Sequence, residues 1–235
     1  MLDSEHGGPA RPPGGRNTVD ATILRVLLVI SAYLSGSIPV GVIVARLSGG
    51  PDPRSIGSGR TGGTNALRAL GRRWAALVVA GDLAKGAIPV LAARLLTDGD
   101  PGIEVLTAFA AVVGSSRSAF LRFGGGRGVG TGVGTMLVIQ PIAVVIAAPV
   151  FFLAIVITRY VSLGSLLGSA AILPAMLLIW AVASGAVPPA YLAWAVVGPA
   201  LIWLAHADNI NRLLHGTERK FDLGLLGGRR GGGAA

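Results

Sequence analysis

Long apolar runs dominate this chain of 235 residues and decide what it can fold into. A helix that crosses the hydrocarbon core of a bilayer needs about 20 mostly apolar residues. Charged residues make up only 13% of the chain, against roughly 25% in a soluble domain. We therefore expect an all-α integral membrane protein, with candidate spans at residues 22–46, 73–96, 102–118, 128–158, 161–182 and 188–206.

The fourth run, 128–158, is too long for a single span. Pro141, which follows Gln140, lies in its middle. Proline has no backbone N–H and interrupts a helix. Dividing the run into helices over 128–140 and 142–158 gives seven transmembrane helices.

The connections between these spans alternate in charge. The loop after the first span carries several arginines, the next connection (97–104) is acidic, and the alternation continues to a basic C-terminal segment. Positively charged loops stay on the cytoplasmic side of a membrane. We therefore expect the N-terminus outside and the C-terminus inside, with the polar stretches described below facing the cytoplasm.

The two ends of the chain differ in composition from its centre. Residues 1–21 are polar and rich in Gly, Pro and Arg, which predicts a disordered tail. Residues 22–221 form the predicted seven-helix membrane domain, and 222–235 a flexible Gly- and Arg-rich tail. The net charge of +9 is spread between apolar runs, which favours anionic ligands over nucleic acid. The absence of cysteine excludes disulfides and thiolate chemistry.

The first polar stretch, residues 51–68, combines glycines with hydroxyl, amide and guanidinium groups. Glycine lets backbone amides approach a ligand closely. Arginine presents a fork of donors that suits phosphate. The stretch therefore predicts a phosphate-binding loop, with a flexible turn-rich loop as the alternative; its candidate residues are Arg54, Gly57, Ser58, Gly59, Thr64, Asn65 and Arg68.

The second stretch, residues 114–131, is a glycine-rich turn that leads into a helix. Free backbone amides and the helix dipole favour an anion at such a position. The Gly-Lys-Ser/Thr ending of a Walker A loop is missing. The alternative is a packing loop with topological arginines, and the candidate binding residues are Ser115, Gly125, Gly126, Arg127, Gly128 and Thr131.

The third stretch, residues 206–220, is expected to continue the last helix out of the membrane. His206, Asn209 and Arg212 follow one another at three-residue spacing and so share a helix face. A binding face and a solvated helix end fit this spacing equally well. Asp82 and Lys85, three apart within a span, are expected to pair and to hold their helix against the polar site.

Together these stretches resemble the acyl-phosphate:glycerol-3-phosphate acyltransferase family of bacterial membranes. Residues 57–68 resemble the family motif G-S-G-N-x-G-A-T-N-x-x-R, and 114–131 resemble G-H-x-x-P-x-F-x-x-F-K-G-G-K-G-V-A-T. Residues 206–220 resemble H-R-x-N-I-x-R-L-L-x-G-T-E-x-K, the most specific of the three. The resemblance covers about residues 22–221, and the family's seven helices with the N-terminus outside agree with the count above.

The resemblance implies transfer of a fatty acyl group from acyl-phosphate to the sn-1 hydroxyl of glycerol 3-phosphate, giving lysophosphatidic acid. It implies the bacterial plasma membrane, a cytoplasmic active site, an upstream enzyme that makes acyl-phosphate, and no metal or other cofactor. The catalytic residues that it implies are His206, Asn209, Ser58 and Arg68. The remaining candidates, with Arg212 among them, would bind substrate, whereas Asp82, Lys85 and Glu218 would be structural.

The chain departs from the family pattern at several positions. Ser115 stands where the family has His, and Ser for His removes a possible acid or base. The other departures are Arg60 for Asn, Ser118 for Pro, Gly124 and Arg127 for Lys, Gly63 and Gly130 for Ala, and Ala207 for Arg. Two alternatives therefore stay open: a transporter or binder of a phosphorylated small molecule, and a catalytically impaired regulatory paralogue.

Overall fold

The computed structural model describes residues 15–183, 187–222 and 224, which contain helices and no strand. Short 3-10 helices cover Pro53–Ser55 and Ala119–Leu121. Of the two predicted tails, 1–14 and 225–235 lie outside the described residues, whereas 15–21 begin the first helix. The α-helices are α1 (Gly15–Ser37), α2 (Val40–Ser48), α3 (Gly63–Leu70), α4 (Arg72–Leu96), α5 (Pro101–Ser116), α6 (Val129–Ile139), α7 (Pro141–Thr158), α8 (Val161–Ala170), α9 (Ile172–Val182), α10 (Pro189–Ala205) and α11 (Ala207–Leu214).

Five helical segments of the described chain are long and apolar enough to cross a membrane: 18–37, 72–96, 101–121, 141–158 and 161–182. The bent pair of α10 and α11 makes a sixth if the two helices count as one span. The helix α6 has 11 residues. At 1.5 Å per residue it is about 16 Å long, roughly half of a 30 Å hydrocarbon core. An all-helical membrane fold is thus confirmed, and the count of seven spans stays a prediction.

Several expected helices begin or end elsewhere, and proline explains some of the breaks. The predicted break at Gln140 is confirmed, because α6 ends at Ile139 and α7 begins at Pro141. The single helix expected over 22–46 is wrong: α1 ends at Ser37 and α2 begins after Pro39. Proline disfavours helical geometry in the residue before it.

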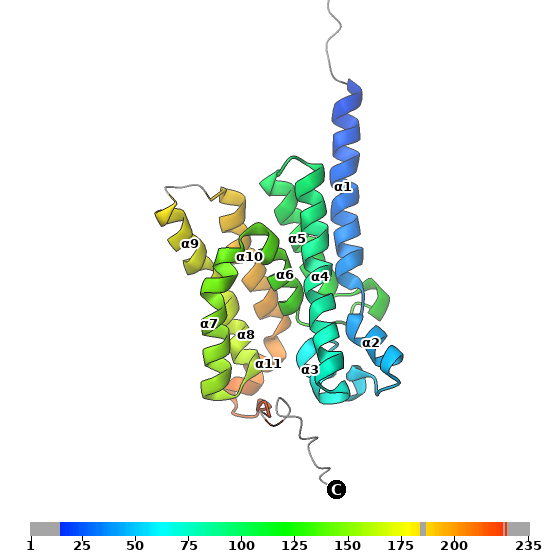
Figure 1. Ribbon diagram of the computed structural model, residues 1–235, viewed down its shortest axis with the longest axis vertical. Coiled ribbons are helices and arrows are strands. Elements are labelled where there is room, and N and C mark those ends of the chain that lie inside the picture. The colour runs from blue at the N-terminus through cyan, green and yellow to red at the C-terminus, as the bar shows by residue number, and fades with distance from the viewer. Residues whose placement is uncertain (1–14, 184–186, 223, 225–235) are drawn as a thin grey trace, which may run out of the picture.

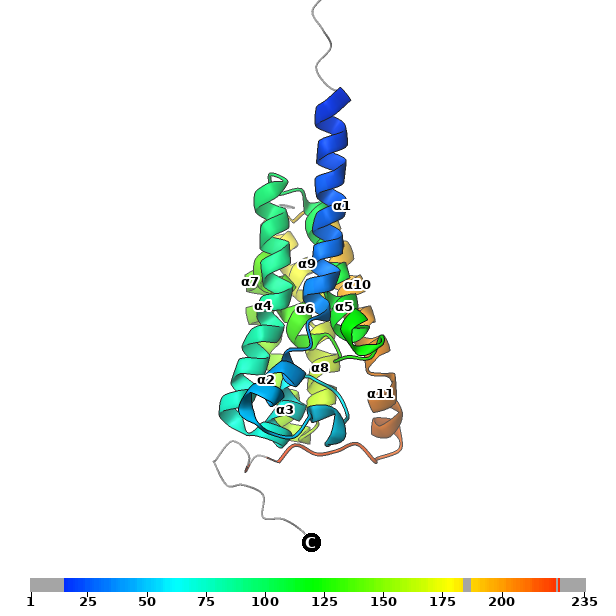
Figure 2. The same ribbon diagram turned by 90° about the vertical axis from the view of Figure 1, so that its right-hand side faces the viewer.

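The chain also bends where a straight helix was expected. Instead of continuing the last span, α11 turns by 67° from α10 at His206. Figure 2 shows α2, α3 and α11 together at one end of the bundle, and the start of α1 projecting at the other. The first and third polar stretches therefore lie at this end of the molecule (Figure 1).

Glycines let α4 and α6 pack closely side by side. A Cβ atom at Gly86 of α4 would meet the backbone oxygen of Thr131 in α6. A Cβ at Gly134 of α6 would likewise meet the backbone oxygen of Leu83 in α4. Small residues at helix interfaces allow this approach in membrane proteins, where packing rather than water exclusion drives helix association. The contact fixes α6 against the span that carries Asp82 and Lys85.

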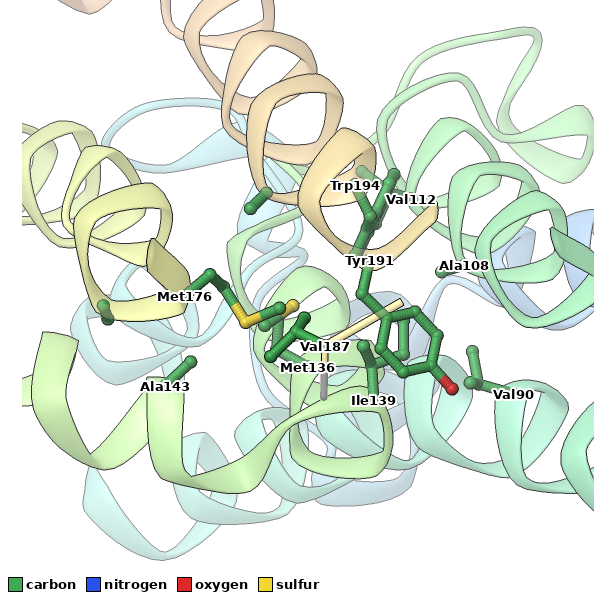
Figure 3. Packing of buried hydrophobic residues seen from close by; sticks show 12 residues of the cluster. Val90, Ala108, Val112, Met136, Ile139, Ala143, Met176, Val187, Tyr191 and Trp194 are labelled. Carbon is green, nitrogen blue, oxygen red and sulfur yellow. The ribbon is translucent and has the colours of Figure 1, made fainter. Parts of the chain in front are cut away.

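The main apolar core lies among α4, α5, α6, α7, α9 and α10 (Figure 3). Met176 and Trp194 are its largest fully buried members. The outward faces of the spans are apolar as well: Val145 and Ile157 of α7 are each 70% exposed. An exposed apolar surface of this kind suits lipid and not water.

A buried charge cluster ties α6 to the bundle at the end away from the polar stretches. Arg94 donates from Nε and Nη2 to the two oxygens of Glu104, at 2.9 and 2.7 Å. The Tyr191 hydroxyl donates to the same carboxylate at 2.8 Å, and Glu104 is completely buried. Arg94 Nη1 also donates to the backbone oxygen of Val138, at 2.7 Å. The cluster thus satisfies one of the free carbonyls at the C-terminal end of α6.

Glu104→Ala tests this cluster. The variant removes a fully buried carboxylate to which both Arg94 and Tyr191 donate. Because the Arg94 side chain is 34% exposed, the cost should fall below the roughly 3–5 kcal/mol of breaking a fully buried pair. We expect a clear drop in the thermal unfolding temperature of the protein in detergent. The control is Arg25→Gln, which removes the exposed 3.1 Å pair with Asp100 and should cost about 1 kcal/mol or less. Equal melting temperatures for the two variants would contradict the role of the cluster.

Candidate functional site

A cavity of about 500 Å³ lies where the three polar stretches meet. Its polar wall includes Ser58, Arg60, Thr64, Asn65 and Arg68 from the first stretch, Ser115, Gly126, Arg127 and Gly128 from the second, and His206, Asn209, Arg212 and Glu218 from the third. Residues from three stretches far apart in sequence therefore line one cavity. The structure shows that these residues line one cavity, and the role of each residue stays a prediction.

Most of the remaining cavity wall is apolar. It is built mainly from α6, α7, α8, α9 and α10, with Met136, Phe151, Ile172 and Trp194 among its members. One cavity thus combines a cationic, hydroxyl-rich end with a hydrocarbon-lined end. Such a space suits a ligand that carries an anionic head and an apolar tail.

Asn65 shapes the first loop from inside. It is buried, and its Nδ2 atom donates to the backbone oxygens of Pro53, Ile56 and Arg60, at 2.6, 3.0 and 2.8 Å. Its Oδ1 atom accepts from the amide of Ser58 at 3.1 Å. Because the loop occupies both ends of this side chain, the structure points to a loop-shaping role for Asn65.

Five candidates do not line the cavity: Arg54, Gly57, Gly59, Gly125 and Thr131. Arg54 pairs with Asp52 at 2.6 Å on the surface, and its guanidinium lowers the pKa of that carboxyl. Gly57 and Gly59 have positive φ angles and turn the loop. Thr131 donates to the Ser115 hydroxyl at 2.9 Å, so that it supports a residue on the wall.

The glycine-rich turn presents Arg127 at the N-terminal end of α6. Gly128 has φ of 74°, a conformation that favours glycine. The amide of Gly126 donates to the backbone oxygen of Ser115 at 3.0 Å and holds the turn in place. Burial lowers the pKa of the Arg127 guanidinium, because the charged form loses solvent. Its Nε atom has no hydrogen-bond partner among the described residues.

His206 and Asn209 offer two hydrogen-bond acceptors on the same wall. His206 is buried, and its Nδ1 atom lies 2.8 Å from the backbone oxygen of Ile202. A carbonyl only accepts, so Nδ1 carries the proton and Nε2 is the acceptor of the neutral ring. Asn209 donates from Nδ2 to Glu218 at 2.7 Å. Its Oδ1 atom is buried and has no partner within the described chain.

Glu218 joins three segments at the cavity. Its carboxylate accepts from Ser162 Oγ at 3.0 Å, from Asn209 Nδ2 at 2.7 Å and from Arg212 Nε at 2.7 Å. The side chain is 7% exposed. This geometry fits the structural role predicted for Glu218, because it ties α8, α11 and the segment after α11 together.

Arg68 and Lys85 are two further charged residues of the wall that were named as candidates from the sequence. Arg68 is half-buried, and burial together with the charge of Arg219 lowers its pKa. Lys85 pairs with Asp82 at 2.8 Å, as the spacing predicted. Lys85 Nζ also donates to the backbone oxygen of Ile38 at 3.3 Å, at the break between α1 and α2. The pair therefore joins α4 to that break.

Several polar residues at or beside the wall were not among the candidates, and they include Arg60, Ser162, Asp208 and Arg219. Ser162 lies in the segment Thr158–Gly164, which also looks like a family signature. Arg60 was noted only as a departure from the family pattern. Asp208 stands between His206 and Asn209, but helix spacing turns it to another face. Contacts in space between the polar stretches and α8 bring these residues together.

The donor set does not indicate a metal centre. In the part of the chain that the structure describes, no group of three or more His, Cys, Asp or Glu residues is placed to hold a metal ion.

Asn65→Ala tests the loop-shaping role. The variant removes the hydrogen bonds that hold the loop, each worth about 1 kcal/mol. We expect trypsin to cleave at Arg54 and Arg60 about tenfold faster or more in the folded protein. Asn211→Ala, on the exposed face of α11, is the matched control. Unchanged cleavage of the Asn65 variant would show that the loop keeps its shape without this side chain.

Comparison with known protein families places the chain among acyltransferases. The family model described as glycerol-3-phosphate acyltransferase matches residues 26–216. A glycerol-3-phosphate acyltransferase of Rubrobacter xylanophilus is 42% identical over 211 residues, which cover 90% of this chain and all of the relative. A second one, from Syntrophotalea carbinolica, is 41% identical over 196 residues, covering 83% and 96% of the two chains.

Solved structures agree with the sequence comparison. The chain is similar to PlsY (YgiH), an integral membrane glycerol 3-phosphate acyltransferase, in its glycerol 3-phosphate form. The TM-score is 0.78 with 36% identity, covering 88% of this chain and 100% of that structure. The form of the same protein with lysophosphatidic acid gives a TM-score of 0.76 with 37% identity, covering 86% and 98%.

Proposed function

Since this chain belongs to the glycerol-3-phosphate acyltransferase family, we propose that it acylates the sn-1 hydroxyl of glycerol 3-phosphate with the fatty acyl group of acyl-phosphate. The product is lysophosphatidic acid, and the reaction is the first acylation of phospholipid biosynthesis. The observation that carries the proposal is the single cavity with arginines at one end and an apolar wall at the other. The acyl-phosphate is supplied by a separate upstream enzyme.

The chemistry needs orientation more than a strong catalytic base. The acceptor hydroxyl oxygen attacks the carbonyl carbon of acyl-phosphate, and the bond from that carbon to the phosphate oxygen breaks. The hydroxyl proton passes to the departing phosphate, which is itself a base. Catalysis then rests on holding both substrates in line and on stabilising charge. A covalent acyl-enzyme is not required.

The residues divide between the two substrates by their place on the wall. We assign Ser58, Thr64 and Arg68 to the acyl-phosphate, with Asn65 acting through the shape of the loop. Arg127, with Gly126 and Gly128 of the glycine turn, takes the phosphate of glycerol 3-phosphate, and Gly125 shapes that turn. The unpartnered Arg127 Nε donor supports this assignment.

His206 and Asn209 orient the glycerol hydroxyls. Asn209 Oδ1 is an acceptor without a partner in the described residues, and His206 Nε2 is the acceptor of the neutral ring. A hydroxyl can donate to either atom, whereas a phosphate dianion cannot. These acceptors therefore support a ligand with both a phosphate and a free hydroxyl.

We further propose seven crossings of the bacterial plasma membrane, with the N-terminus outside and the cavity at the cytoplasmic face. The described start of α1 and the end of the described chain lie at opposite ends of the bundle (Figure 1), which needs an odd number of crossings. Counting α10 gives six long spans, so α6 supplies the seventh. The arginines around the cavity support its cytoplasmic location.

The departures at Ser115 and Arg60 do not remove the cavity. Both residues line it, and Ser115 receives the hydrogen bond from Thr131. The arginines of the described cavity wall come from the three polar stretches, whereas Arg94 and Glu104, at the other end of the bundle, pair with each other and do not line the cavity, which disfavours the alternative of a transporter. An impaired paralogue remains the outcome that the next experiment can distinguish.

His206→Ala tests the assigned activity. Purified protein is given palmitoyl-phosphate and labelled glycerol 3-phosphate, and labelled lysophosphatidic acid is measured. We expect product from the wild type and a loss of about 10²-fold or more in His206→Ala and in Arg68→Ala, because orientation and charge stabilisation are removed. His215→Ala, an exposed histidine of the same segment, should keep wild-type activity.

Two results would count against the proposal. A well-folded wild type that forms no product from palmitoyl-phosphate or from palmitoyl-coenzyme A would indicate an impaired paralogue. Product from palmitoyl-coenzyme A alone would show that the donor is wrong.

A further inference from the structure

One carboxylate lies among three arginines that come from three different segments. Asp208 Oδ2 accepts from Arg127 Nη2 at 3.3 Å and from both Nη atoms of Arg212 at 3.3 Å. Arg60 Nη2 lies 4.0 Å from Asp208 Oδ1. Arg60 belongs to the loop before α3, Arg127 to the glycine turn before α6, and Arg212 to α11.

The arginines line the cavity, and Asp208 does not. The carboxylate therefore contacts the three guanidinium groups from outside the wall. Three like charges placed together repel one another, and the repulsion is stronger where water is partly excluded. The charge of Asp208 behind them, together with that of Glu218 on Arg212, reduces this repulsion and still leaves these five groups with one net positive charge at the cavity.

We propose that Asp208 is a positioning residue that assembles Arg60, Arg127 and Arg212 into one binding face for the phosphate of glycerol 3-phosphate. The proposal rests on the function proposed above. Arginine forks bind phosphate well only when their direction is fixed, because a free side chain loses rotamer freedom on binding. Asp208 fixes that direction before the substrate arrives.

The surroundings of the carboxylate set it apart from an ordinary surface ion pair. The side chains of Arg60, Arg127 and Arg212 are 34%, 16% and 30% exposed, and that of Asp208 is 38% exposed. The Asp208 Oδ1 atom is buried and has no hydrogen-bond partner in the described residues. The charge of Asp208 opposes the loss of protonation that burial and the other two arginines impose on Arg127. The interaction is thus partly shielded from solvent and joins all three polar stretches.

The test is Asp208→Asn, which keeps the shape of the side chain and removes its charge. The KM for glycerol 3-phosphate, the KM for palmitoyl-phosphate and kcat are measured separately. We expect Asp208→Asn to raise the KM for glycerol 3-phosphate about tenfold or more, with the other two constants within about threefold. Asp208→Glu, which keeps the charge, should recover most of the affinity.

The matched control is Asp100→Asn. Asp100 pairs with Arg25 at 3.1 Å on α1, away from the cavity, and asparagine still caps α5. This variant should behave as wild type. A merely structural role for Asp208 would raise both KM values or lower the melting temperature, and either result would overturn the proposal.

Further results of the same measurements also support or overturn the positioning role of Asp208. An unchanged KM for glycerol 3-phosphate in Asp208→Asn overturns the proposal, and so does a lower KM, which would mean that the carboxylate competes with the phosphate. If the wild type forms no product, the proposed function fails, and equilibrium binding of labelled glycerol 3-phosphate replaces kinetics. Weaker binding by Asp208→Asn then supports the positioning role. Equal binding, or no binding by the wild type, overturns it.

Discussion

A helix half as long as the bilayer is thick must end inside protein, because hydrocarbon offers no partner for its free backbone groups. The helix α6 meets this constraint at both ends. At its C-terminal end, Arg94 donates to the backbone oxygen of Val138 and is itself held by Glu104. At its N-terminal end, the glycine turn opens into the cavity, where a substrate anion can use the free amides. The charge cluster at one end of the bundle therefore supports the position of the site at the other.

The same logic explains the carboxylates around the cavity. A site for two phosphate-bearing substrates needs several cations, and several cations in one place destabilise the protein before a substrate arrives. Glu218 and Asp208 offset this repulsion from positions where they also fix the arginines. The cavity is thus preorganised, which is the condition under which charged groups stabilise a transition state well.

Part of this fold could be predicted from sequence, because it depends on the geometry of neighbouring residues along the chain. The break at Pro141 follows from the missing N–H of proline, and the pairing of Asp82 with Lys85 follows from helix spacing. The bend at His206 and the role of Asp208 depend on contacts between segments far apart in the chain. Asn65 shows the same limit, since its hydrogen bonds to the loop backbone could not be read from its position in the sequence. Spacing gave candidate residues but not which of them contact one another.

Ser115 bears on both the packing of the site and its proposed chemistry. Where the family pattern has a histidine, this chain places a hydroxyl that accepts from Thr131, while its backbone oxygen accepts from Gly126. The position therefore links α5 to α6 and to the glycine turn. A serine hydroxyl does not ionise near neutral pH, so Ser115 lacks the acid–base capacity of the histidine in the family pattern. This fits the proposed mechanism, in which the proton of the acceptor hydroxyl goes to the leaving phosphate and the protein holds the two substrates in the geometry that allows it.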